Sequence, residues 1–143
     1  MALDLGSKRI GVAVSDASGT LASPRRVLTR TGDRSRDHAG IAALVAEEEA
    51  ELVLVGLPLS LDGSDGPAAT AARAEAAELA TVLPVPVVLH DERLTTVTAH
   101  QLLEARGLDS RARRKVVDQA AAAVMLQAWL DGGGIHSVRE GGQ

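Results

Sequence analysis

The first sixteen residues contain two short apolar runs joined by a tight turn, and an acidic residue interrupts the first run. Residues 2–6 and 10–15 have the composition of strands, and Gly6-Ser7-Lys8-Arg9 between them is typical of an antiparallel hairpin. Asp4 stands where a buried strand favours Val or Ile. An ionised carboxylate there is costly unless a cation or hydrogen-bond donors compensate it. We therefore expect Asp4 either to carry chemistry or to cap the turn.

Size and composition restrict the chain to a small set of classes. Its 143 residues fit one domain, which we expect to span residues 1–130, followed by a glycine-rich, disordered tail over residues 131–143. The single aromatic residue, Trp129, leaves Ala, Val and Leu to build the core, which favours a layered α/β protein. The absence of cysteine excludes disulfides and thiolate chemistry. Without an apolar run of spanning length, we expect a cytoplasmic protein with no membrane partner.

Charge is distributed unevenly along the chain. The net charge is −4, but basic residues gather in segments 8–36 and 106–115, whereas acids concentrate at 47–51 and 75–78. Together the basic segments could form one face for a nucleic-acid backbone, or they could simply be solvated surfaces.

The pattern along the chain predicts strands and helices in the order β-β-β-α-β-α-β-α-α. After the hairpin we expect a third strand at 20–29, helices at 35–50, 68–83, 95–106 and 115–130, and further strands at 52–57 and 87–90. Residues 58–67 read as a loop and residues 107–114 as a basic, polar link. The last two strands should be parallel, and function gathers at the carboxyl ends of such strands. Asp4, the 58–67 loop and the segment from Asp91 fall at or near these ends.

Three acids from distant elements could converge at this edge. Asp4 lies on the first strand, Glu92 follows the fifth and Asp118 lies in the closing helix. An oxygen-only site suits Mg²⁺ or Mn²⁺, and two such ions can activate water and stabilise the leaving oxygen of a phosphodiester. With 19 acids in the chain, such a triple also arises by chance. Taken alone, Asp118 reads as a first-turn residue favoured by the helix dipole.

Four segments in the same order resemble one family. DLGSKRIGVAVSD, VGLPLSLDG, HDERLTT and VDQAAAAVML are similar to motifs of the YqgF (RuvX) family of ribonuclease H-like nucleases, and the resemblance covers nearly all of residues 2–130. It implies a three-layer α/β/α fold with a five-stranded mixed sheet of order 3-2-1-4-5, related to the Holliday-junction resolvase RuvC. It also implies a metal-dependent phosphodiesterase that matures the 5′ end of pre-16S ribosomal RNA.

The resemblance implies roles for individual acids. Asp4, Glu92 and Asp118 would be catalytic and would ligate Mg²⁺ or Mn²⁺, with Asp91 as a further metal ligand. The resolvase branch carries a glutamate on its fourth strand, where this chain has Val55-Gly56-Leu57. Glu92 or Asp91 would have to replace it, and strand alternation sends the two to opposite sides. We favour the longer Glu92. Fallback ligands in the glycine-rich loop are Asp62 and Asp65.

Basic residues near these acids would hold substrate phosphates. Lys8, Arg9 and Arg93 are the candidates, although Arg93 could instead pair with a neighbouring carboxylate. His90 could orient a carboxylate or water, but a hydrogen-bonded strand-end histidine is the more ordinary interpretation.

The leading hypothesis is an RNA nuclease acting on pre-16S rRNA as a monomer or weak homodimer. The first alternative is a resolvase of branched DNA, which would require a symmetric dimer. The second is a nucleic-acid-binding protein that keeps the fold without strong catalysis. An ATP-dependent phosphotransfer protein also begins with an Asp-x-Gly hairpin, but it would need two such domains.

Overall fold

The computed structural model describes residues 1–92 and 110–134, with side chains described from Ala120 onward in the second range. The strands are β1 (Ala2–Leu5), β2 (Arg9–Ser15), β3 (Ala22–Thr29), β4 (Val53–Leu57) and β5 (Val87–Asp91). The helices are α1 (Arg34–Glu47), α2 (Pro67–Val82) and α4 (Ser110–Asp131). None of these helices is both long enough and apolar enough to span a bilayer.

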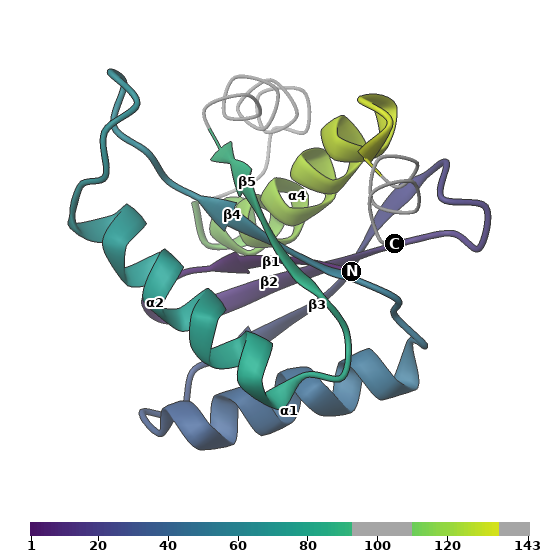
Figure 1. The fold of residues 1–143 in the computed structure, drawn as a ribbon, viewed down its shortest axis with the longest axis horizontal. Helices are drawn as coiled ribbons and strands as arrows, with labels where there is room; N and C mark the ends of the chain where they lie inside the picture. The colour runs from purple at the N-terminus through teal and green to yellow at the C-terminus, as the bar shows by residue number, and fades with distance from the viewer. Residues whose placement is uncertain (93–109, 135–143) are drawn as a thin grey trace.

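The five strands form one mixed sheet in the order β3-β2-β1-β4-β5, which confirms the predicted topology (Figure 1). The first three strands are an antiparallel meander, with Asp4 opposite Gly11 in the β1–β2 hairpin. β4 then pairs parallel to β1, and β5 pairs parallel to β4. Because β1, β4 and β5 run in the same direction, their carboxyl ends meet at one edge of the sheet.

Helices cover both faces of the sheet, giving the predicted three layers (Figure 1). Alternation along the strands divides the core in two. Leu3 and Val55 pack with residues of α1 and α2, whereas Ala2 and Leu54 pack with Met125 of α4. The core contains no Phe or Tyr, so small and branched aliphatic side chains fill both interfaces.

The start of α1 follows the local sequence signals. Asp33 has an extended backbone and its side chain accepts a hydrogen bond from the Arg36 amide, as an N-cap should. Ile41, Leu44 and Val45 are buried on one face of the helix. Helix α2 begins at Pro67, where the fixed φ of proline suits the first helical position.

The boundaries of the closing helix differ from the prediction. Helix α4 begins at Ser110, so assigning residues 110–114 to a polar link was wrong. Arg and Ala are strong helix formers, and their propensity extends the helix through this charged segment. Asp118 consequently lies about two turns inside the helix, which removes the first-turn dipole explanation for it. Asp131, assigned to the tail, is the last residue of α4. The predicted helix at 95–106 and tail residues 135–143 lie outside the described residues.

Candidate active site

The carboxyl edge of the sheet brings together acids that are far apart in the sequence. Asp4 is near the end of β1, and Glu92 immediately follows β5. β4 lies between these two strands. The side chains of Asp4 and Glu92 nevertheless meet in a hydrogen bond across β4. Two carboxyl groups can share a hydrogen bond only when one of them holds a proton.

The surroundings of Glu92 disfavour its ionised form. Burial of its side chain, the nearby charge of Asp4, the hydrogen bond with Asp4 and the charge of Asp91 together raise the pKa of Glu92 to about 7. Both desolvation and a like charge penalise the ionised form. Near neutral pH the pair therefore holds a proton, and a cation placed between the two groups would compensate the second negative charge instead.

Gly56 in β4 provides the space for this arrangement. A Cβ atom on Gly56 would lie 2.2 Å from Glu92 Oε1 and 2.9 Å from its Cδ. Any other residue would occupy the volume that the Glu92 carboxyl group fills. The space beside Gly56 in the fourth strand is thus filled by a carboxyl group reaching over from the end of the fifth strand. Sequence reasoning noted that the fourth strand carries no glutamate but did not identify Gly56 as the residue that makes room for Glu92.

The other acids named from the sequence have different environments. Asp91 is the last residue of β5, opposite Leu57, and its charge contributes to the raised pKa of Glu92. Asp118 lies on α4, a helix that packs against β1, but its side chain is outside the described residues. Within the described side chains, no group of three His, Asp or Glu residues is placed to hold a metal ion. The described part of the site is therefore the Asp4–Glu92 pair.

The two fallback ligands are engaged locally in the loop after β4. The Asp62 carboxylate accepts hydrogen bonds from the Ser64 amide at 2.9 Å and from its hydroxyl at 2.6 Å. Asp65 pairs with Arg73, with Nε 2.6 Å from Oδ2. No contact that the structure describes joins Asp62 or Asp65 to the Asp4–Glu92 pair.

Two of the three basic candidates lie at the turn that connects β1 and β2. Lys8 is exposed in the turn between β1 and β2, and Arg9 is the first residue of β2. Both follow Asp4 within five residues, so their Cα atoms lie within about 18 Å of it. Arg93 lies outside the described residues.

His90 is one strand position before Asp91 and pairs with Gly56. Its buried Nε2 has no hydrogen-bond partner within the described part of the chain, so a hydrogen-bonded strand-end histidine is not what this region shows. Desolvation lowers the pKa of His90, while the charge of Asp91 opposes that effect.

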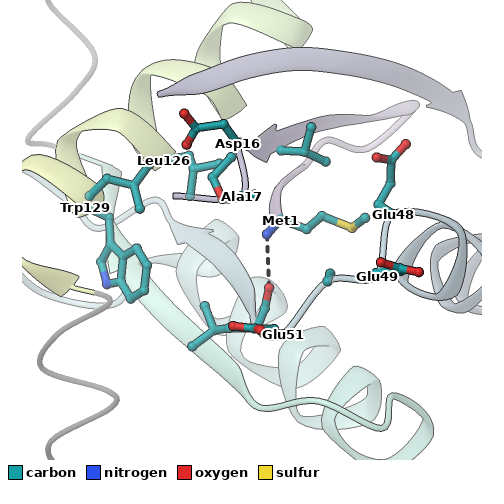
Figure 2. Close-up of a pocket in the computed structure, with 13 residues that line it drawn as sticks. Met1, Asp16, Ala17, Glu48, Glu49, Glu51, Leu126 and Trp129 are labelled. Atoms are coloured by element: carbon teal, nitrogen blue, oxygen red, sulfur yellow. Dashed lines mark hydrogen bonds between the residues drawn. The ribbon is translucent and has the colours of Figure 1, made fainter. Parts of the chain in front are cut away.

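A cavity of about 520 Å³ lies at the opposite edge of the sheet (Figure 2). Met1 and Leu52, which precede β1 and β4, line it together with Trp129 from α4. The Met1 ammonium donates a hydrogen bond to the Leu52 carbonyl at 3.0 Å. The rim is acidic, with these residues: Asp16, Glu48, Glu49 and Glu51. An acidic rim repels a phosphate backbone, so this cavity is not the candidate nucleic-acid site.

Solved structures share the fold at low sequence identity. The RuvC structure from Thermus thermophilus matches with a TM-score of 0.52 and 16% identity, covering 92% of this chain and 94% of that chain. RuvC from T. thermophilus in complex with a Holliday junction substrate matches with a TM-score of 0.56 and 15% identity, covering 92% and 93%. These likenesses show a RuvC-like, ribonuclease H-like fold.

Sequence relatives are much closer. Proteins named "Putative pre-16S rRNA nuclease" are 51% identical in Kineococcus radiotolerans, over 92% of this chain and 70% of the relative, and 48% identical in Anaeromyxobacter sp., over 92% and 96%. The family model described as "RuvX: Holliday junction resolvase" matches residues 1–132. With nearly the whole chain matched and half of its residues identical to these relatives, the protein belongs to the RuvX family.

Proposed function

We propose that this protein is a metal-dependent nuclease that hydrolyses phosphodiester bonds of RNA during maturation of the 5′ end of pre-16S rRNA. The observation that carries the proposal is the contact between the Asp4 and Glu92 carboxyl groups beside Gly56. Family membership and the names of the relatives support the substrate. The cysteine-free chain fits a reaction in the cytoplasm.

The residues at this edge fit a hard divalent cation. Both described donors are carboxylates, and Mg²⁺ and Mn²⁺ favour oxygen ligands. Burial and the contact with Asp4 also raise the pKa of Glu92, because both disfavour the ionised carboxylate. A bound cation would offset the repulsion between the two groups. Asp4 and Glu92 would hold the ions, and Asp118 and Asp91 are the further ligands we propose. When bound, such ions supply activation of water and stabilisation of the leaving oxygen.

The chain's own residues would orient the substrate. Lys8, Arg9 and Arg93 are proposed to contact phosphates on either side of the bond that is cut. Arginine does so through bidentate hydrogen bonds, whereas lysine acts as a point charge. These contacts are independent of base identity, so sequence preference would have to come from other parts of the surface.

One experiment tests the proposal directly. Purified protein and the Asp4→Asn variant are incubated with precursor 16S rRNA, an unrelated single-stranded RNA and a four-way DNA junction, each with Mn²⁺ or with EDTA. We expect Mn²⁺-dependent cleavage of the precursor that Asp4→Asn abolishes. Cleavage that is equal in Asp4→Asn would come from a contaminating nuclease and would contradict the proposal.

A second candidate function is resolution of branched DNA. The description of the matching family model and the likeness to RuvC favour it. Coordinated cutting of two strands requires a symmetric dimer. Preferential cleavage of the junction, together with a dimer at assay concentration in analytical ultracentrifugation, would select this candidate over RNA maturation. Specific binding to the precursor with no cleavage in any metal would instead indicate a binding protein that keeps the fold.

A further inference from the structure

A buried ionic cluster lies behind the hairpin that carries Asp4. Asp37, His38 and Glu75 are the buried charged or titratable side chains among the described residues, and Arg30 joins them. They come from three elements, since Arg30 follows β3, Asp37 and His38 are in α1, and Glu75 is in α2.

Arg30 is held in one orientation by a two-pronged contact. Its Nη1 and Nη2 atoms each donate to one Glu75 carboxylate oxygen at 2.8 Å. His38 Nε2 lies 2.8 Å from Glu75 Oε2 and fixes the carboxylate from the other side. Burial alone would raise the pKa of Glu75, but the hydrogen bonds from Arg30 and His38 lower it to about 2. Glu75 is therefore ionised at neutral pH and accepts both hydrogen bonds from Arg30.

The remaining donors of Arg30 reach the β1–β2 turn. The side-chain Nε donates to the Gly6 carbonyl at 2.7 Å. The Arg30 backbone amide donates to the Lys8 carbonyl at 2.9 Å. Both ends of the turn are thus attached to the same residue.

Gly6 links this attachment to Asp4. Its amide donates to the Arg9 carbonyl at 2.9 Å and also lies 3.1 Å from the Asp4 carbonyl. A Cβ on Gly6 would be 2.5 Å from the Arg9 carbonyl oxygen, so the turn is too tight for any side chain there. With its amide held by the hairpin and its carbonyl held by Arg30, the Gly6 peptide has little freedom. Gly6 follows Asp4 by two residues, so a fixed Gly6 peptide restrains the backbone from which the Asp4 side chain extends.

Stability alone does not account for such a cluster. A buried ion pair commonly contributes no more than well-packed apolar side chains of similar volume, because desolvation offsets the attraction. What the charged fork adds over apolar packing is a fixed orientation and a hydrogen bond to Gly6. Metal ligands lose affinity when the groups that orient them are removed.

We propose that Arg30, held by Glu75 and His38, is a positioning residue that fixes the Gly6 turn and thereby the Asp4 carboxylate relative to Glu92. This inference rests on the proposed function, since it treats Asp4 as a metal ligand. It assigns a role to residues more than 25 positions from Asp4 in sequence that no motif indicated.

The test separates orientation from stability. Arg30→Met and Glu75→Gln each leave a buried charge without its partner and should lower the melting temperature. The double variant Arg30→Met/Glu75→Leu removes both charges of this pair and should be more stable than either single variant, yet it still lacks the donor to Gly6. We expect roughly tenfold weaker Mn²⁺ binding in the double variant, measured by the free-Mn²⁺ signal in electron paramagnetic resonance. Activity should recover at saturating Mn²⁺.

Two further proteins complete the experiment. Arg25→Met/Glu48→Leu makes the same change at an ion pair beside the opposite edge and should bind Mn²⁺ as the parent does. If the Arg30/Glu75 double variant does not fold, Arg30→Lys keeps the charge but loses the fork and should weaken Mn²⁺ binding in the same direction.

The outcomes distinguish this inference from the proposed function. A folded double variant, or a folded Arg30→Lys, with parental Mn²⁺ affinity would overturn the positioning role while leaving the metal site intact. Equal Mn²⁺ binding by the parent and by Asp4→Asn would overturn the metal site itself, and the inference with it.

Discussion

The two edges of the sheet carry similar residues but opposite electrostatics. At the carboxyl edge, burial and the charge of Asp4 raise the pKa of Glu92 to about 7. At the other edge, amide groups of Thr20 and Leu21 donate to the exposed Asp16 carboxylate and lower its pKa. Asp16 is satisfied by its own loop, whereas Glu92 meets a second carboxyl group. The comparison shows that acids become candidates for chemistry when folding desolvates them together, and that their presence near a cavity is not enough.

The largest difference between the edges should appear when one acid on each is neutralised. Asp4→Asn should reduce nuclease activity by about 1000-fold or more, equivalent to about 4 kcal/mol of transition-state stabilisation, because it removes a charge from the proposed metal site. Asp16→Asn should retain parental activity. Initial rates on precursor rRNA in Mn²⁺ measure both, and comparable losses in the two variants would remove the distinction between the edges.

Filling the space at Gly56 should have the next largest effect. Gly56→Ala places a Cβ against the end of the flexible Glu92 side chain, so the carboxyl group must swing away at little cost to folding. We expect a loss of roughly 10- to 100-fold in Mn²⁺ affinity, measured by titration calorimetry, with a melting temperature close to that of the parent.

Gly40→Ala is the matched control for that substitution. Gly40 lies in α1, and a Cβ there would meet nothing within 4 Å. The change should leave Mn²⁺ affinity unaltered and raise stability by about 0.5–1 kcal/mol through helix propensity. If Gly56→Ala binds Mn²⁺ as well as Gly40→Ala does, Glu92 is not a ligand.

The raised pKa of Glu92 predicts a pH dependence. Below about 7 the ion must displace a proton, so Mn²⁺ affinity should rise by up to about tenfold per pH unit and level off above pH 7. In Glu92→Gln this dependence should disappear. Mn²⁺ titrations between pH 5.5 and 8, a range that brackets the raised pKa of Glu92, would show this dependence. If Glu92→Gln kept the pH profile of the parent, the displaced proton would belong to another group.

The smallest expected effect concerns stability without metal. Because the pKa of Glu92 is raised in the folded state, its protonated side chain contributes stability to the fold. This stability is fully present below the ordinary pKa of 4.5 and is lost as pH rises through about 7. Asp16 acts in the opposite sense, since its lowered pKa stabilises the fold above the ordinary value and the effect is lost on acidification. Melting temperatures of the metal-free protein and of Glu92→Gln should therefore converge at acidic pH and diverge toward neutral pH, with the variant more stable.

Local signals in the sequence determined much of the fold. The expected ranges 35–50, 52–57 and 68–83 lie within three residues of the observed α1, β4 and α2, because breakers and apolar periodicity act over a few positions. The predicted start of α4 was five residues too late, because it too was judged from the local sequence alone. A charged segment reads as a link by polarity but forms helix by propensity.

The chemistry at the carboxyl edge depended on contacts between distant segments. Sequence reasoning from the alternating elements placed Asp4 and Glu92 near the ends of strands, and the resemblance to the RuvX family suggested their roles. Only the tertiary structure decided that Glu92 crosses β4 through the volume that Gly56 leaves empty, and that Arg30 and Glu75 hold the turn beside Asp4. Periodicity encodes which face a residue occupies, but the register between strands and the desolvation of a carboxyl pair arise only when the sheet is assembled.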